Sequence, residues 1–424
     1  MPLQMPRAAA LRTLVVGLAA VIAGFGSYVL LIFVSQGTST ADYADFAVFW
    51  SLTVTVGLGF FYPVEQETAR SIAGVSDGRG GLVRFVFLCA FVIAVATGLV
   101  ALLLLTPAAG GYLGSGGLVL ALVLSFFGYA VQFPVRGMMS GSRRTTSYSA
   151  IIALEGALRV VLPAIILAAG IAGSFSFALV VPVAAAVSVL PAVLSRDRSW
   201  LAFDRIRTGL YAGRLARLIV AALSIQLILN SGTLIARFVG GESGAALTGQ
   251  ILVCITIARI PVFGYQVLQI LYLPRLAREW QLHQLSAARR TVLVAVGVSV
   301  AAGVAIVVGM VLLGPWVIGL LFGADRVLSE GGIALVSLGV AVFLIALIMS
   351  DGTLAMGRHT VVIRSWVIAA AAAVAPVLVI ADPLLRVTSP LIVGSSVALI
   401  QLGASMVQAM KSERDVTSRD AVTS

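Results

Sequence analysis

Long apolar stretches separated by short polar gaps recur along the whole chain. A run of about 20 apolar residues is long enough to cross the hydrocarbon of a bilayer as an α-helix. The sequence predicts twelve such spans, at 14–34, 46–64, 82–105, 118–135, 148–169, 175–194, 218–235, 247–273, 292–313, 333–356, 361–380 and 391–410. We therefore expect an all-α polytopic membrane protein.

The basic residues divide unevenly between alternate gaps. If the N-terminus lies in the cytoplasm, 23 of the 28 lysine and arginine residues fall in or beside cytoplasmic gaps. The outer gaps hold only Arg237, Arg326 and Arg386. By the positive-inside rule, this division predicts that both termini are cytoplasmic. The net charge of +11 then reflects membrane topology, and it does not indicate a nucleic-acid partner.

A weak internal similarity suggests two related halves. A shift of 205 residues aligns 45–48 with 250–253, and a shift of 215 residues aligns 136–144 with 351–359. Membrane transporters are often built from such repeats. We expect spans 1–6 and spans 7–12 to form two parallel six-helix bundles around a central cavity.

These bundles define the predicted domains. The N-terminal bundle covers residues 1–195 and the C-terminal bundle covers 217–410. Between them, residues 196–216 carry apolar side chains at helical spacing among arginines, which predicts an amphipathic helix on the cytoplasmic surface. Residues 411–424 form a predicted cytoplasmic tail.

The residues that support enzymatic chemistry are sparse. Lys411 is the only lysine, so the chain has no Walker A phosphate-binding loop. Cys89 and Cys254 fall inside spans, and His283 and His359 are single residues in separate gaps, so the sequence predicts no metal site and no cofactor. We expect transport to draw on an ion gradient, the membrane potential or the substrate gradient.

Charged residues inside the spans are the candidate site. A charge at the bilayer centre costs roughly 2.5–3.5 kcal/mol on insertion scales, so such residues are functional candidates. Arg259 lies twelve residues into its span and close to Pro261, which frees backbone groups, and its guanidinium is suited to a diphosphate. Glu155 and Arg159 are spaced i, i+4 and are expected to pair, either as a gating element or as a structural ion pair.

Further polar residues complete the prediction. Glu65 follows Pro63 at the inner end of span 2, where we expect it near the interface or in an inner gate. Four amide side chains, which suit sugar hydroxyls or link helices, are candidate substrate ligands: Gln226, Asn230, Gln266 and Gln269.

Three short motifs resemble those of bacterial polysaccharide flippases. The motifs that carry this resemblance are residues 42–47 (eYGxF-like), residues 136–144 followed by Glu155, Gly156 and Arg159 (RGxxxGxxR…EGxxR-like), and residues 258–261 (aRxP-like). The chain is therefore similar to the Wzx-like members of the multidrug/oligosaccharidyl-lipid/polysaccharide exporter superfamily. It departs from the lipid II flippases of that superfamily, which generally carry additional spans.

The resemblance implies a substrate and partners. A Wzx-like protein moves a polyprenyl-diphosphate-linked oligosaccharide from the cytoplasmic to the outer leaflet by alternating access, for cell-surface polysaccharide biosynthesis. The implied partners are this lipid-linked glycan, membrane lipids and a polysaccharide polymerase or glycosyltransferases, with no nucleotide or nucleic acid. The alanine-rich composition favours a high-GC bacterium, and the expected location is the bacterial cytoplasmic membrane.

Three alternatives stay open. The first is an ion-coupled multidrug or small-molecule antiporter of the same superfamily, a class that favours acidic cavity residues and aromatic cages. The second is a major-facilitator transporter, because residues 74–81 vaguely resemble the cytoplasmic motif of that class. The third is a membrane-embedded glycosyltransferase or polymerase using Asp42 and Asp45, but acidic residues also favour helix N-termini. The longest outer gap, 314–332, is too short for an enzymatic domain, so we expect a transporter and not an enzyme.

Overall fold

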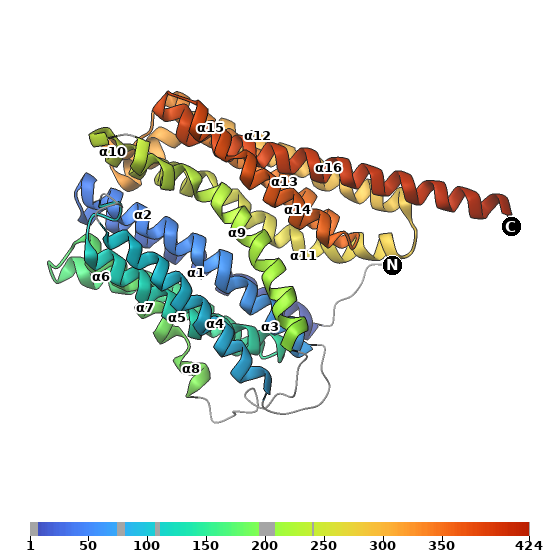
Figure 1. The fold of residues 1–424 in the computed structure, drawn as a ribbon, viewed down its shortest axis with the longest axis horizontal. Helices are drawn as coiled ribbons and strands as arrows, with labels where there is room; N and C mark the ends of the chain where they lie inside the picture. Colours follow the sequence, from blue (N-terminus) through green and yellow to red (C-terminus); the bar gives the residue numbers. More distant parts are fainter. Residues whose placement is uncertain (1–6, 74–80, 107–110, 195–207, 240, 424) are drawn as a thin grey trace. The chain divides into compact units, whose positions relative to one another are not determined.

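Helices account for almost all of the described chain. The computed structural model describes residues 7–73, 81–106, 111–194, 208–239 and 241–423 (Figure 1). Within these residues there is no β-strand, and twelve helices are long and apolar enough to cross a membrane. The predicted all-α fold with twelve spans is confirmed. The physical reason is that backbone amides have no water partner in hydrocarbon, so a spanning segment must satisfy them internally.

The helices pack as two compact units, which divide between Leu223 and Ser224 within α9. We refer to residues 1–223 as unit 1 and residues 224–424 as unit 2. The elements of unit 1 are α1 (Arg7–Gly37), α2 (Thr40–Val56), the π-helical η1 (Gly57–Phe61), α3 (Tyr62–Ala73), α4 (Gly81–Leu102), η2 (Leu103–Leu105), α5 (Gly116–Gly141), α6 (Thr145–Ala168), α7 (Ser174–Ser188), α8 (Leu190–Val193) and the first part of α9 (Thr208–Val239).

Unit 2 begins with the second part of α9. Its further elements are α10 (Gly241–Ala258), α11 (Ile260–Gln281), α12 (Leu285–Phe322), η5 (Ala324–Arg326), α13 (Glu330–Ala355), α14 (His359–Ala372), α15 (Val374–Val379) and α16 (Pro383–Thr423). Of the predicted amphipathic linker, residues 196–207 lie outside the described residues, and 208–216 form the start of α9. The predicted tail continues α16 through Thr423.

Small residues allow the closest helix contacts in unit 1. α1 and α6 pack along their length, and Gly26 faces Gly156 at their crossing. A β-carbon placed on Gly156 would lie 2.7 Å from the backbone of Ala23 and Ile22. Close backbone approach through glycine is a common way for membrane helices to associate, because lipid removes the hydrophobic driving force between them.

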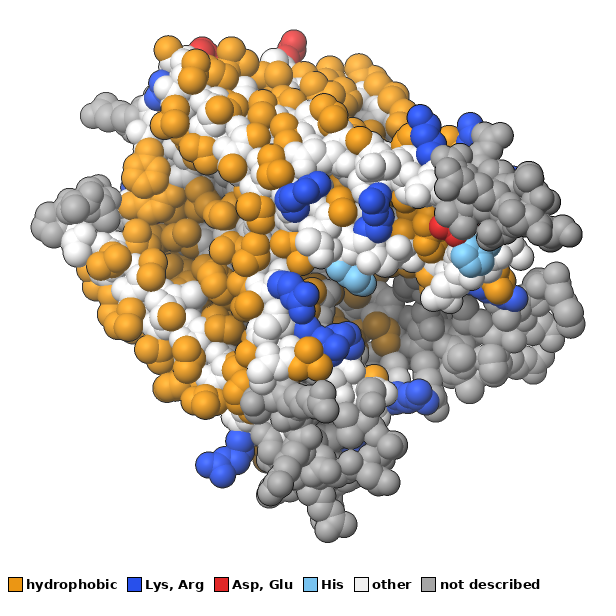
Figure 2. Space-filling view, turned by 45° about the vertical axis from the view of Figure 1, so that its right-hand side comes forward, with side chains coloured by type: hydrophobic (Ala, Val, Ile, Leu, Met, Phe, Trp, Pro, Cys, Tyr) orange, Lys and Arg blue, Asp and Glu red, His pale blue; other side chains and the backbone are white. Residues whose placement is uncertain are grey.

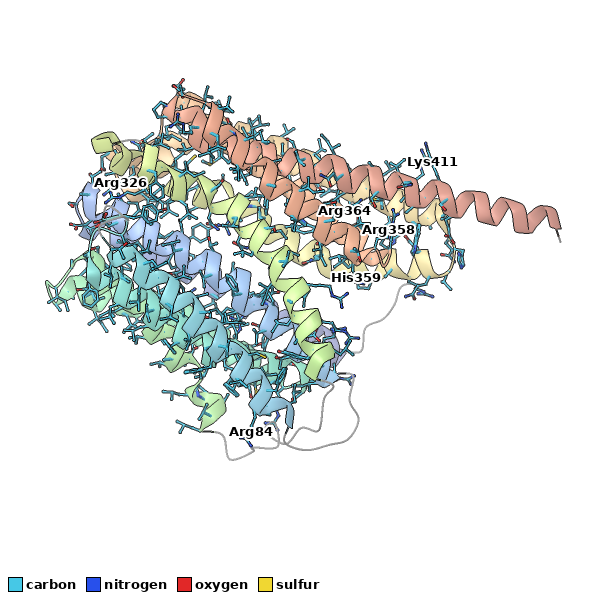
Figure 3. All side chains as sticks on the ribbon, in the orientation of Figure 1. Arg84, Arg326, Arg358, His359, Arg364 and Lys411 are labelled. Atoms are coloured by element: carbon cyan, nitrogen blue, oxygen red, sulfur yellow. The ribbon has the colours of Figure 1, made fainter. Side chains whose placement is uncertain are left out.

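The surface is typical of a protein embedded in lipid. Hydrophobic side chains form a broad area in Figure 2, and most of the visible lysine and arginine side chains lie outside it. Exposed leucine, valine and phenylalanine side chains occur on most of the long helices. In unit 2, Arg358, His359, Arg364 and Lys411 lie toward one end of the helices, and Arg326 lies toward the opposite end (Figure 3). This is the separation that the distribution of basic residues predicts, although which end is cytoplasmic stays a prediction.

Candidate functional site

The second spanning helix is irregular in both units. In unit 1 it passes from α2 through the five-residue π-helix Gly57–Phe61 into α3. In unit 2 the corresponding segment breaks between α10 and α11 at Arg259, just before Pro261. The predicted shift of 205 residues places the break at Arg259 opposite Val54, three residues before the π-segment begins, so the two irregularities fall close together but not at the same position. π-Segments and proline breaks free backbone groups and are frequent at functional sites.

Beyond the π-segment, α3 carries Glu65 into a buried charge cluster of unit 1. Only 4% of the surface of Glu65 is exposed. Its Oε2 lies 2.9 Å from Nε of Arg136 on α5, and its Oε1 accepts a 2.8 Å hydrogen bond from the Tyr148 hydroxyl of α6. α3 continues the apolar span, and the bundle encloses the Glu65 carboxylate eight residues before α3 ends. Its place near the membrane interface or in an inner gate stays a prediction.

Glu155 and Arg159 extend this cluster along α6. Arg159 Nη2 donates to Glu155 Oε1 at 2.5 Å, which confirms the pairing predicted from their i, i+4 spacing. Glu155 Oε2 also lies 3.7 Å from Nη1 of Arg136, so one arginine faces both carboxylates. The side chains of Arg136 and Arg159 are only 14% and 12% exposed.

Aromatic rings and one hydroxyl complete the surroundings of the two arginines. The Arg136 guanidinium lies 5.0 Å from the ring centroid of Phe133, and that of Arg159 lies 5.7 Å from the ring of Trp50. Both distances are within the range of cation–π attraction. Arg159 also donates a 2.9 Å hydrogen bond to Ser27 on α1. The cluster thus joins α1, α2, α3, α5 and α6 through polar contacts.

The charges of the unit 1 cluster balance. Two arginines and two glutamates make its formal charge zero, which lowers the cost of burying each ion in the bundle. Removing any one member would leave an uncompensated charge. This arrangement can hold helices in one geometry, and it can change when a ligand or a proton replaces one of the contacts.

Unit 2 holds a different polar cluster around Asp351 on α13. The Asp351 carboxylate accepts hydrogen bonds from the hydroxyl of Tyr265 and from Nε2 of Gln269, the latter at 2.7 Å. Both donors lie on α11, beyond the helix break. Asp351 is 7% exposed, and no arginine or lysine among the described residues pairs with it. Its charge is therefore met by neutral donors alone.

The sequence did not single out Asp351, Tyr265, Tyr148 or Trp50, but it held a signal for Asp351. The predicted shift of 215 residues places Arg136 opposite Asp351, on the fourth spanning helix of each unit. Each of these residues is the centre of its cluster, and each contacts the second, irregular helix of its unit. In this alignment, the two units place opposite charges at matching positions, and the repeat itself stays a prediction.

The remaining predicted site residues occupy separate places in unit 2. Arg259 is half-buried at the junction of α10 and α11. On α9, Asn230 donates to the backbone and side-chain oxygens of Gln226, at 3.0 and 3.2 Å. Gln269 belongs to the Asp351 cluster, and the side chain of Gln266 lies outside the described residues. Their role as substrate ligands stays a prediction.

Asp42, considered above as a catalytic carboxylate, lies in the first turn of α2, whose N-cap is Ser39. Ser39 Oγ accepts from the Asp42 backbone N–H at 3.1 Å and donates to its Oδ2 at 2.8 Å. An acidic side chain is favoured in this turn, which is the structural alternative that the sequence offered for Asp42. The described residues contain no group of three or more histidine, cysteine, aspartate or glutamate side chains placed to hold a metal ion.

Comparison with known proteins identifies the fold. No protein-family model and no curated protein sequence matches the chain. An inward-facing multidrug resistance MATE family transporter of the MOP superfamily matches with a TM-score of 0.72 at 14% identity, over 93% of this chain and 96% of that chain.

Two further solved structures are similar. The Vibrio cholerae MATE transporter VcmN in its bent form has a TM-score of 0.60 at 14% identity, over 96% of this chain and 99% of that one. A MOP superfamily transporter from Pyrococcus furiosus is described as having a binding pocket of reverse polarity. It has a TM-score of 0.62 at 14% identity, over 95% of this chain and 96% of that chain. The chain has the fold of MATE transporters of the MOP superfamily, and its assignment to the polysaccharide flippases stays a prediction.

Proposed function

We propose that the protein is a secondary transporter that exports an amphipathic solute by alternating access, coupled to the movement of a proton or an alkali cation. The observation that carries this proposal is the buried Asp351, whose charge is not balanced by any described basic residue. A carboxylate inside a membrane bundle is costly unless it is paired or neutralised. Binding of a proton or a cation at Asp351 would supply the missing charge.

The contacts of Asp351 suggest how binding there affects the fold. Tyr265 and Gln269 both donate to the Asp351 carboxylate from α11, so they tie α11 to α13. A proton on Asp351 removes a charge that these hydrogen bonds stabilise, and an alkali cation competes for the same oxygen lone pairs. Either event weakens the connection between α11 and α13, which lies just beyond the helix break at Arg259. A change at this hinge is a means of coupling cation binding to helix movement.

The unit 1 cluster would serve as the gating element of this transporter. Glu65 and Glu155 share Arg136, so a solute that draws this arginine away disturbs both contacts together. Because the cluster joins helices through buried ion pairs, it favours discrete arrangements over gradual deformation. The similar solved structures that are described as multidrug transporters favour the antiporter alternative over the flippase hypothesis.

The lipid-linked oligosaccharide flippase is the second candidate. It is favoured by the placement of two motif arginines, Arg136 and Arg159, against aromatic rings inside the bundle. Guanidinium groups bind phosphate through paired hydrogen bonds, and aromatic faces stack on sugars and rings. In this candidate the substrate diphosphate would displace a glutamate from an arginine, and Arg259 would be a second phosphate ligand.

Proteoliposomes distinguish the two candidates. We expect purified protein to accumulate a cationic dye when a proton or sodium gradient is imposed, and Asp351→Asn to abolish the gradient dependence. In parallel, protection of a fluorescent polyprenyl-diphosphate glycan from an external quencher reports flipping. If the glycan flips, the dye does not move and Arg259→Ala stops flipping at equal expression, the flippase replaces the antiporter. If both Asp351→Asn and wild type move dye identically without a gradient, the coupling proposal is refuted.

A further inference from the structure

A groove of about 700 Å³ runs between α11, α12 and α13 in unit 2. Its walls are apolar over most of their length. On α12 the lining residues Val294, Val298 and Ala302 follow one helix face at i, i+4 and i+8. On α13 the facing wall is made by Leu344 and Ile348, again at i, i+4. Val294 and Val298 are 59% and 46% exposed, so the groove is open along this side.

Two arginines lie at one end of the groove. Arg275 is six residues before the end of α11, and Arg290 is five residues after the start of α12, so both lie within about 9 Å of the turn that joins these helices. The Arg275 side chain is 68% exposed and pairs with Glu279 at 2.9 Å. Arg290 is exposed and has no ion pair or hydrogen bond among the described residues. This end of the groove therefore has an excess of positive charge.

Two buried hydroxyls in the groove are also without partners. Thr291 Oγ1, next to Arg290, and the Tyr272 hydroxyl of α11 are inaccessible to solvent and make no hydrogen bond to any described residue. Their residues are 9% and 8% exposed. Neither oxygen has accessible surface, and the Tyr272 hydroxyl lies against Gly352 of α13, so a ligand in the open groove does not reach these hydroxyls. The two arginines alone define the charged end of the groove, and they favour an anion.

The length of the groove matches one leaflet. From Arg290 to Ala302 the α12 wall rises about 18 Å, at 1.5 Å per residue. Half of a typical hydrocarbon core is about 15 Å thick. A charged group held at the arginine end would therefore sit near the membrane surface while an attached chain followed the apolar wall inward.

We propose that this groove binds one anionic phospholipid of the leaflet that adjoins the α11–α12 turn. Its phosphate lies between Arg275 and Arg290, and one acyl chain runs along Val294, Val298 and Ala302. Lipid tails are as apolar as these side chains, so burial of the chain adds little selectivity. Selectivity comes from the head group, at about five-fold in affinity for each basic residue near the surface. The groove also reaches Tyr265 of the Asp351 cluster, but the lipid assignment rests on its arginine end and its apolar wall.

Native mass spectrometry of the full chain, released from nanodiscs of phosphatidylcholine and phosphatidylglycerol, tests this site. We expect one phosphatidylglycerol to be retained in preference to phosphatidylcholine. Arg290→Gln should weaken this retention about five-fold, and the double change with Arg275→Gln about 25-fold. Arg289→Gln is the matched control, because Arg289 is an exposed neighbour of the same charge that does not line the groove.

One further variant tests the acyl-chain wall without removing charge. Val298→Trp should block the groove and release both lipids. Equal retention of both lipids by the wild type, or equal loss in the Arg289 and Arg290 variants, would overturn the proposal. Displacement of phosphatidylglycerol by an equimolar isoprenyl phosphate would overturn the phospholipid assignment. Dye transport is not part of the readout, so failure here leaves the transport proposal standing.

Discussion

Replacement of Arg136 by glutamine is the most direct test of the unit 1 cluster. Arg136 faces two buried carboxylates, with Nε 2.9 Å from Glu65 and Nη1 3.7 Å from Glu155. At an effective dielectric constant of about 20, these distances correspond to attractions of about 6 and about 4 kcal/mol. The cost of desolvating the arginine offsets much of this sum in the wild type. Without the arginine, Glu65 and Glu155 lose this attraction, while the cost of burying their carboxylates remains.

We expect Arg136→Gln to lower the free energy of unfolding by about 3–5 kcal/mol, the usual cost of breaking a buried ion pair from one side. For a unit of about 220 residues this corresponds to a loss of roughly 6–20 °C in melting temperature. The double variant Arg136→Gln/Glu65→Gln should recover most of the loss, because Arg159 still neutralises Glu155. The measurement is the fraction of monodisperse protein left after heating in detergent.

The control is Arg217→Gln, which removes an exposed arginine of the same unit that bonds only a backbone carbonyl. This change should shift the melting temperature by no more than a degree or two. The reasoning is refuted if the Arg136 and Arg217 variants melt together. It is also refuted if the double variant is less stable than Arg136→Gln, since the carboxylate would then not be the source of the penalty.

Three further outcomes follow from the same structure. Gly156→Ala should lower the free energy of unfolding by about 1–3 kcal/mol, because the added methyl group forces α1 and α6 apart. Gly17→Ala is the control and should be neutral, since an added β-carbon there meets nothing within 4 Å. Equal melting temperatures for the two variants would contradict the close approach of the helices. Asp351→Asn should fold normally, because its amide oxygen still accepts from Tyr265 and Gln269, yet lose gradient-driven transport; retained coupling would rule out Asp351. Single cysteines at Ser115 and Ser142 should react with impermeant reagent from the outside and the cytoplasm respectively, and consistent reversal would invert the predicted topology.

The sequence alone determined the membrane class and the number of spans. A membrane helix depends mainly on local interactions, since its backbone hydrogen bonds are internal and its length is set by the bilayer. The apolar runs were therefore sufficient for twelve helices, and the i, i+4 spacing was sufficient for the Glu155–Arg159 pair. Both depend on neighbours in the chain, so no tertiary information was needed.

Only the tertiary structure decided what surrounds each buried charge. From the sequence, Glu65 was placed only at the inner end of its span, near the interface or in an inner gate, and its partners Arg136 on α5 and Tyr148 on α6 were not predicted. The hydrogen bonds to Asp351 come from Tyr265 and Gln269 on α11, more than 80 residues earlier in the chain. The predicted repeat in the sequence aligned Arg136 with Asp351, yet their opposite charges are met by partners on other helices. The packing of non-adjacent helices chooses those partners, and hydropathy and spacing along one segment carry no information about it.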